Sequence, residues 1–311
     1  MNWSTTGFIA QGGEEEEDNQ LISLELPDAT KKEIDFTDSS FFTTPNRHLP
    51  TPAEVRAISK DAYKSYKVTP VVFENVNLIV KFGTDVTIVE AVNLWMIKKA
   101  FQNEVPVPEL FGWRVDDEGY VFMYMELIKG LTLHECRDSL NTMQKRAITD
   151  QLSQIMGNLR RLKQDPSDPF IGSINRQHLL DRTFEFKPKT GPIPSVKEFI
   201  DWFALLPQIL ASYRYDDPDR CFLPDTGEIK FTHADLHKRN IIVSSFDPVQ
   251  MVIVDWEQSG WYPDYWEYCK ACRTCYKGDE WHTDFVGEFL EPQEDLYHVF
   301  MDYCFVMGSF F

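Results

Sequence analysis

The segment Phe231–Glu257 constrains the fold of this chain more than any other part of the sequence. It contains two short apolar runs, Ile241–Val243 and Met251–Val254, which are separated by a turn with Asp247 and Pro248. Apolar runs of strand length on either side of a turn are typical of two buried strands in a hairpin. Because a hairpin brings its two ends together, we expect the polar residues that flank these runs to meet.

Three residues able to do chemistry flank the two runs. Asp235 and Asn240 precede the first run on one loop, and Asp255 directly follows the second. The hairpin would therefore gather two carboxylates and one amide oxygen around a small volume. Oxygen ligands of this kind suit Mg²⁺, which is usually held by one or two carboxylates together with substrate phosphates and water.

The spacing of these residues matches the parts of a phosphoryl-transfer site. Such a site needs a carboxylate that accepts the proton of the attacking hydroxyl, and separate ligands that hold the metal on the nucleotide phosphates. His233, Asp235 and Asn240 form an H-x-D-x-x-x-x-N loop, and Asp255 supplies the later acid, in the order of kinase-type sites. Taken singly, each residue has the alternative role of capping a turn or filling a loop. Their joint occurrence favours the catalytic interpretation.

At this point the sequence resembles the aminoglycoside phosphotransferase and choline kinase-like enzymes, which are small-molecule relatives of protein kinases. The resemblance rests on the HxDxxxxN loop and the hydrophobic strand that ends in Asp255, and it covers nearly the whole chain after residue 50. The continuation GWYPDYWEY, Gly260–Tyr268, is similar to the form found in many fungal members.

The resemblance implies an α+β, two-lobed protein kinase-like fold. A small antiparallel-sheet N-lobe that binds nucleotide would span residues 51–127, and a larger, mostly helical C-lobe with the catalytic loop and substrate cleft would span 128–311. Residues 1–50 would form an acidic N-terminal extension that is partly disordered, because they include the run Glu14–Asp18.

The resemblance also implies an activity and a role for each residue of the loop. The reaction would move the γ-phosphoryl group of ATP to a hydroxyl of a small molecule. Asp235 would take the hydroxyl proton and His233 would support the loop. Asn240 and Asp255 would hold Mg²⁺. Positioning and electrostatics would supply most of the rate.

The N-lobe is expected to supply the nucleotide phosphates with a cation. Val71–Phe82 has the pattern of two strands around a turn, and Lys81 lies near the end of the second strand. In kinase-type sites such a Lys holds phosphates and is fixed by a Glu on the following helix. Glu90 is that candidate. In the alternative, Thr87-x-x-Glu90 is a capping box in which Glu90 bonds the backbone of Thr87.

A hinge between the lobes is expected at the end of the apolar run Tyr120–Leu127. By resemblance, an adenine would lie against the backbone of Met125, Glu126 and Leu127. The same letters also fit a plain buried strand and a turn.

One expected part is missing from the sequence. There is no Walker A motif or GxGxxG, and no glycine lies between Val68 and Val80, so a plain strand turn would cover the phosphates. This motivates the alternative of a catalytically impaired kinase-like binding or scaffold protein.

The composition limits the classes of partner. The net charge of −18 argues against nucleic-acid binding, which relies on Lys and Arg contacts to phosphate. The charge would steer a cationic acceptor, or else would only keep the protein soluble. The acidic residues considered for contact with such an acceptor are Asp264, Glu267, Asp279 and Glu280. No run of 18 apolar residues and no signal-like start is present, so we expect no membrane span and a cytoplasmic location. The oligomeric state is left open.

The C-terminal part of the chain is expected to be helical and well packed. Lys145–Lys163 has apolar residues at helical spacing, which predicts a central helix of the larger lobe. Cys269, Cys272 and Cys275 would lie along one helix face, as buried free thiols or, in the alternative, as metal ligands. The five aromatic residues of Gly260–Tyr268 are expected to pack in the core.

Overall fold

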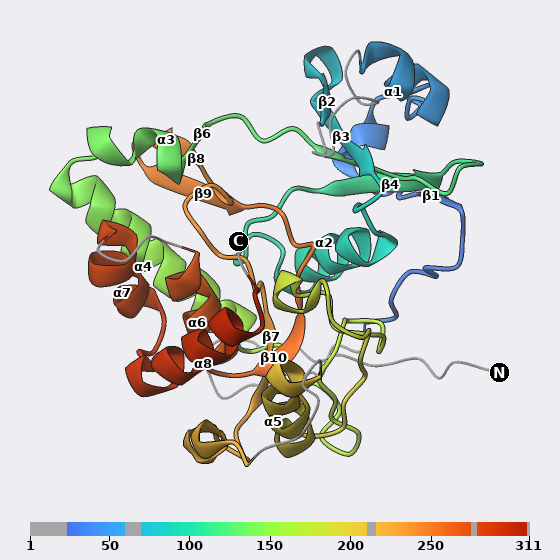
Figure 1. Cartoon of the computed structure of the whole chain (residues 1–311). Helices are drawn as coiled ribbons and strands as arrows, with labels where there is room; N and C mark the ends of the chain where they lie inside the picture. Colours follow the sequence, from blue (N-terminus) through green and yellow to red (C-terminus); the bar gives the residue numbers. More distant parts are fainter. Residues whose placement is uncertain (1–23, 60–69, 210–215, 275–278, 310–311) are drawn as a thin grey trace.

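The computed structural model describes residues 24–59, 70–209, 216–274 and 279–309. They form an α+β structure with a strand-rich lobe and a larger lobe that is mostly helical (Figure 1). The predicted fold class is confirmed in this respect. The acidic run Glu14–Asp18 and residue Cys275 lie outside the described residues.

Five antiparallel strands make up the sheet of the smaller lobe, in the spatial order β1-β4-β5-β3-β2. Their bounds are β1 Glu33–Asp35, β2 Val71–Phe73, β3 Leu78–Gly83, β4 Leu110–Val115 and β5 Val121–Glu126. The two strands expected within Val71–Phe82 are therefore present. The edge strand β1 comes from the region predicted as an extension, so the predicted boundary at residue 51 is too late for the sheet.

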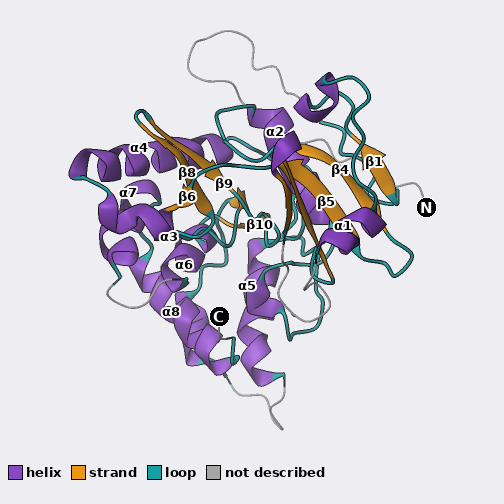
Figure 2. Ribbon diagram, turned by 90° about the horizontal axis from the view of Figure 1, so that it is seen from above, coloured by secondary structure: helices purple, strands orange, loops and turns teal. Residues whose placement is uncertain are grey.

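Strand β3 sends alternate side chains to opposite faces of the sheet. Leu78, Val80 and Phe82 are buried on one face, in a cluster that also contains Val55 of helix α1, Pro52–Ile58. Because side chains alternate along a strand, Ile79 and Lys81 point to the other face. That face carries helix α2, Ile88–Phe101 (Figure 2). Ile79 and Lys81 line the cavity that opens between the lobes. The alternation thus turns the single Lys of this strand towards the opening.

Two capped helices flank this sheet. Helix α1, Pro52–Ile58, begins with a capping box in which Thr51 and Glu54 satisfy each other's backbone N–H groups. Helix α2, Ile88–Phe101, has Thr87 as its N-cap, whose side chain accepts a hydrogen bond from the backbone N–H of Glu90. Apolar residues of α2 join the main core, which continues into the larger lobe.

The larger lobe contains the predicted hairpin. Strand β8 pairs antiparallel with β9 and with the short β6, and β7 pairs with β10. The bounds are β6 Leu131–Thr132, β7 Ile229–Thr232, β8 Ile241–Phe246, β9 Val249–Ile253 and β10 Gly260–Pro263. The catalytic-type loop connects β7 to β8, and Asp255 follows β9, so both reach the same end of the hairpin.

Helices pack around these strands (Figures 1 and 2). Their bounds are α3 Leu133–Cys136, α4 Thr142–Leu159, α5 Val196–Leu205, α6 Trp266–Arg273, α7 Gly287–Phe289 and α8 Glu294–Val306. The predicted stripe of α4 is buried, and so are the five aromatic residues of Gly260–Tyr268. Cys269 and Cys272 are buried on α6. No helix in the described ranges combines the length and the apolarity needed to cross a membrane.

Candidate active site

The loop between β7 and β8 is held from behind by a buried carboxylate. Glu267, at the start of α6, accepts hydrogen bonds from the backbone N–H groups of His233 at 2.6 Å and Ala234 at 3.2 Å. Ala234 has φ of 64°, a left-handed conformation that costs energy for a residue with a side chain. The two bonds to Glu267 offset this cost and fix the direction in which the next residue, Asp235, leaves the loop.

His233 links this loop to the end of strand β9. Burial lowers the pKa of His233 to about 4, so the ring is neutral near pH 7. Its Nδ1 accepts from the backbone N–H of Asp235 at 3.1 Å, which leaves Nε2–H to donate to the carbonyl of Val254, also at 3.1 Å. One tautomer satisfies both contacts. His233 therefore supports the loop, and it does so next to Asp255.

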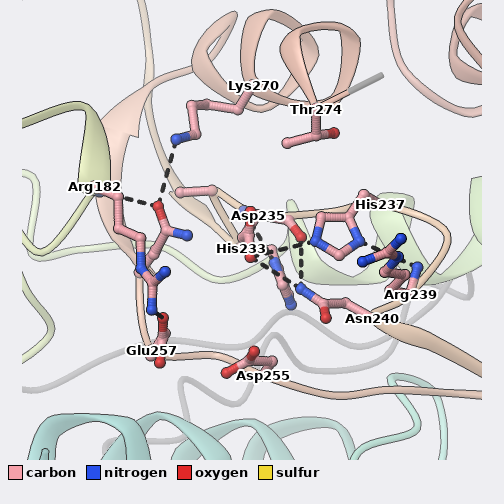
Figure 3. Close-up of polar contacts among 12 residues, drawn as sticks. Arg182, His233, Asp235, His237, Arg239, Asn240, Asp255, Glu257, Lys270 and Thr274 are labelled. Carbon is pink, nitrogen blue, oxygen red and sulfur yellow. Dashed lines mark hydrogen bonds and ion pairs between the residues drawn. The ribbon is translucent and has the colours of Figure 1, made fainter. Parts of the chain in front are cut away.

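Asp235 and Asn240 contact each other directly (Figure 3). The Asn240 amide nitrogen donates to the Asp235 carbonyl at 2.9 Å and to its Oδ2 at 3.0 Å. Burial raises the pKa of Asp235 to about 7; the charge of Lys270 opposes the rise, and that of Asp255 adds to it. A carboxylate with a pKa near the working pH is well suited to accept a proton.

Asp255 lies within reach of this loop. The backbone N–H of Val254 donates to the carbonyl of Asn240 at 2.9 Å, so Asp255 follows immediately after a residue bonded to the loop. Asp255 has φ of 67°, again left-handed. Burial tends to raise the pKa of its carboxyl, but Lys81 outweighs this and holds it below the usual range.

Lys81 connects the two lobes at this point. Its ammonium contacts Glu90 at 2.9 and 3.1 Å, Asp255 at 2.6 Å and Glu257 at 3.2 Å. The predicted pair between Lys81 and Glu90 is present. The capping alternative is half realised, because Thr87 accepts from the backbone of Glu90 while the Glu90 carboxylate turns to Lys81.

The donors available for a divalent cation include Asp255 and Asn240. The Asn240 amide nitrogen faces Asp235, so its amide oxygen faces away from that carboxylate, and the Asp255 side chain is 36% exposed. A carboxylate and an amide oxygen suit Mg²⁺. Asp255 also belongs to a cluster of three carboxylates with Glu90 and Glu257, in which one oxygen of each lies within 4.8 Å of the others. Its common partner is the Lys81 ammonium, which already supplies it with a cation.

A cavity of about 490 Å³ opens between the lobes at this cluster. Lys81, Asp255 and Glu257 line one part of it, and Met125, Glu126 and Leu127 line another, together with the apolar residues Ile79, Leu94, Ile242 and Val254. The cavity thus joins an apolar slot beside the predicted hinge to a polar end. The turn between β2 and β3 lies at the hinge, because Leu127 donates its backbone N–H to Asn77 at 3.1 Å. Residues 60–69, between α1 and β2, are outside the described residues.

A second cavity of about 330 Å³ adjoins the first, and Asp85, Arg182 and Glu257 line both. Its other walls include residues of the segment 178–190 and Trp202 of α5. Arg182 donates to Glu257 at 2.6 Å. The polar ends of both cavities therefore meet at the pair of Arg182 and Glu257.

Three important residues had no clear signal in the sequence. Glu267 counted only as one of four acids near the cleft, and Glu257 and Arg182 were not singled out. The expectation for the other acids needs correction. Asp264, Asp279 and Glu280 do not line either of the two cavities. Asp279 instead pairs with Lys238 and Arg137, and Glu280 pairs with Lys145. The backbone N–H of Asp264 donates to the carbonyl of Glu228.

Replacement of Glu267 by Ala is expected to destabilise the protein by about 2–5 kcal/mol, since two buried N–H groups would each lose an acceptor. Glu267→Gln keeps one acceptor oxygen and should cost less. Urea unfolding monitored by Trp fluorescence measures both, with Glu288→Ala as the control, because Glu288 is an exposed carboxylate of α7. Equal stability of Glu267→Ala and the control would contradict this role.

The chain is similar to a known protein family and to several solved structures. The model of the phosphotransferase enzyme family matches residues 94–306. The crystal structure of aminoglycoside phosphotransferase APH(4)-Ia is similar at a TM-score of 0.50 and 12% identity, over 83% of this chain and 90% of that chain. The GDP and kanamycin complex of APH(2")-IIia is similar at a TM-score of 0.50 and 14% identity, over 78% and 82%. No curated protein matches the sequence of this chain significantly. The structural likeness confirms the kinase-like fold.

Proposed function

The chain belongs to the phosphotransferase enzyme family, and from that premise we propose that it transfers the γ-phosphoryl group of ATP to a hydroxyl of a small molecule in the cleft between its lobes. The predicted class of enzyme is confirmed by the family match. One observation carries the proposal. Lys81 of the N-lobe and Asp255 of the C-lobe meet at 2.6 Å in the wall of a nucleotide-sized cavity, beside the loop with Asp235.

Each side chain has a task that follows from its surroundings. Asp235, whose pKa burial raises to about 7, accepts the proton of the attacking hydroxyl. Lys81 turns from Asp255 to the nucleotide phosphates while Glu90 keeps it in place. Met125–Leu127 and the apolar slot hold the base. His233 and Glu267 hold the loop rigid, so that little reorganisation accompanies the reaction.

Asn240 and Asp255 would hold Mg²⁺, because their oxygens fit a hard cation. When bound, Mg²⁺ neutralises charge on the phosphates. The structure similar to this chain that contains GDP and kanamycin supports a nucleotide and a small hydroxyl compound as the two substrates. The acceptor would enter by the second cavity, whose Phe184 and Trp202 offer apolar surface. A cytoplasmic location is part of the same proposal.

Magnesium and ATP together are expected to raise the melting temperature of the protein. A ligand at about 100 times its Kd adds about 2.7 kcal/mol to the free energy of unfolding. Differential scanning fluorimetry with ATP, with GTP and with magnesium alone measures the shift. Asp255→Asn should lose the magnesium-dependent part, because it removes a ligand charge at nearly constant shape.

Asp302→Asn is the matched control, since Asp302 is an exposed carboxylate on α8. It should respond as the wild type does. If neither ATP nor GTP shifts the melting temperature of the wild type, the alternative of a catalytically impaired binding or scaffold protein is favoured. Once binding is seen, a screen of ATP consumption over amino alcohols and sugars identifies the acceptor class.

A further inference from the structure

Arg182 occupies the junction of the two cavities. It is among the few residues that line both, and its side chain is 60% exposed, so the guanidinium has room to move. A phosphoryl group that passes from a nucleotide in the first cavity to an acceptor in the second must cross this junction. Figure 3 shows the Arg182 side chain extended towards Glu257, on the side of the site where Asp255 lies.

The backbone of Arg182 is fixed although its side chain is exposed. Its N–H donates to the Gln258 side chain at 3.0 Å, and the preceding residue, Asp181, is fully buried. Asp181 accepts from Lys270 at 2.7 Å, from Trp266 at 2.8 Å and from the backbone of Thr183 at 2.7 Å. A fixed backbone therefore carries a long, largely exposed cation, which the bond to Glu257 holds near the site.

The surroundings of Arg182 are acidic. Burial opposes the charge of its guanidinium, but the carboxylates of Glu257, Asp235 and Asp255 outweigh that effect and raise its pKa. The proton acceptor and a metal ligand are thus both within electrostatic range of this cation. The phosphoryl group in transit carries negative charge, which three carboxylates alone would repel.

We propose that Arg182 is a catalytic residue whose guanidinium leaves Glu257 and binds the equatorial oxygens of the phosphoryl group during transfer. In that step a bond forms from the acceptor oxygen to phosphorus, and the bond from phosphorus to the β,γ-bridging oxygen breaks. The electron pair of the broken bond stays on ADP, and the acceptor proton goes to Asp235. Arg182 stays protonated throughout the step. A planar guanidinium with several N–H donors matches the geometry of such oxygens.

The inference rests on the proposed function, and its test separates the two. ADP with magnesium is compared with ADP, magnesium and aluminium fluoride, a planar mimic of the phosphoryl group in transit, by isothermal titration calorimetry on the full chain. The variants are Arg182→Ala and Arg182→Lys. Arg146→Ala is the control, because Arg146 is an exposed arginine on α4 that makes a loose ion pair with Asp150 at 4.0 Å.

Aluminium fluoride is expected to tighten the binding of ADP and magnesium to the wild type and to the Arg146→Ala control. Arg182→Ala should lose roughly 100-fold of that tightening, the usual effect of removing one preorganised donor, while its affinity for ADP alone stays the same. Arg182→Lys should keep part of it. The kcat of magnesium-dependent ATP hydrolysis should fall in parallel, with KM for ATP unchanged.

Three results would overturn these claims, each in a different way. Equal tightening by Arg182→Ala and the wild type refutes the role of Arg182 and leaves the proposed function standing. A wild type that binds ADP with the same affinity whether or not aluminium fluoride is present also refutes that role, because no contact with the planar mimic is then made. A wild type that binds neither ADP nor ATP refutes the proposed function itself.

Discussion

Replacement of Asp235 by Asn is expected to lower kcat by roughly 10²–10⁴-fold, the contribution typical of a positioned proton acceptor. The amide has nearly the same shape and can still accept the bond that Asn240 donates to Oδ2 at 3.0 Å, so the loop keeps its geometry. Only the basicity of the side chain is lost. Nucleotide binding, measured by calorimetry with ADP and magnesium, should be unchanged, and the rate of phosphoryl transfer is followed by coupled detection of ADP.

The dependence of activity on pH provides a second check on Asp235. Because burial raises its pKa to about 7, the residue is largely protonated below that pH in the free enzyme and cannot accept a proton. The value of kcat/KM should therefore rise with pH up to about 7 and then level off. Asp235→Asn should lack this rise. Asp302→Asn should keep both the rate and the profile, and an unaltered profile in Asp235→Asn would rule out Asp235 as the base.

Replacement of Lys270 by Met is expected to destabilise the protein by about 3–5 kcal/mol, because it strands a buried carboxylate. The Asp181 side chain has no exposed surface, and that of Lys270 is 6% exposed, with 2.7 Å between Oδ1 and Nζ. Met fills nearly the same volume, so the loss comes from charge and not from a cavity. Urea unfolding measures the free energy of each variant.

Two further variants test this explanation. Adding Asp181→Asn to Lys270→Met removes the stranded charge and should recover part of the lost stability. Lys197→Met breaks a pair with Asp201 in which the side chains are 57% and 45% exposed, and it should cost less than about 1 kcal/mol. If Lys197→Met and Lys270→Met cost the same, burial of the pair is not what matters.

Acid should weaken the same pair. Burial tends to raise the pKa of Asp181, but Lys270 and the hydrogen bonds outweigh it, and the pKa in the folded protein is lowered. A carboxyl with a lowered pKa stabilises the fold above its pKa in the unfolded chain, and this stabilisation is lost as the pH falls through the folded value. Lys270→Met should therefore be less sensitive to acid than the wild type.

Local patterns in the sequence predicted the parts of the site that lie on single elements. The hairpin β8–β9 and the strand with Lys81 were visible because period and length identify a strand, and alternation then decides which way a side chain points. The HxDxxxxN spacing located the loop. The resemblance to known enzymes alone placed Lys81 and Asp255, 174 residues apart, in one site, and it did not predict their direct contact.

The remaining parts depend on approaches between distant segments that no spacing encodes. Glu267 meets His233 across 34 residues, and Arg182 meets Glu257 across 75. Glu267 is an acid in an aromatic segment, and nothing in its neighbours indicates that it faces inward. Strand β1 was missed because three residues, of which two are exposed and charged, carry too little periodicity to be recognised.

The contacts of Lys81 also affect how tightly a nucleotide can bind. Lys81 and Glu90 belong to one lobe, and Asp255 and Glu257 to the other, so the same ammonium joins the two lobes across the cleft. A triphosphate that binds Lys81 replaces its contacts with Asp255 and Glu257, while the contact with Glu90 remains. Part of the free energy gained at the phosphates therefore offsets the two ion pairs that are lost, and nucleotide affinity is lower than the phosphate contacts alone would give.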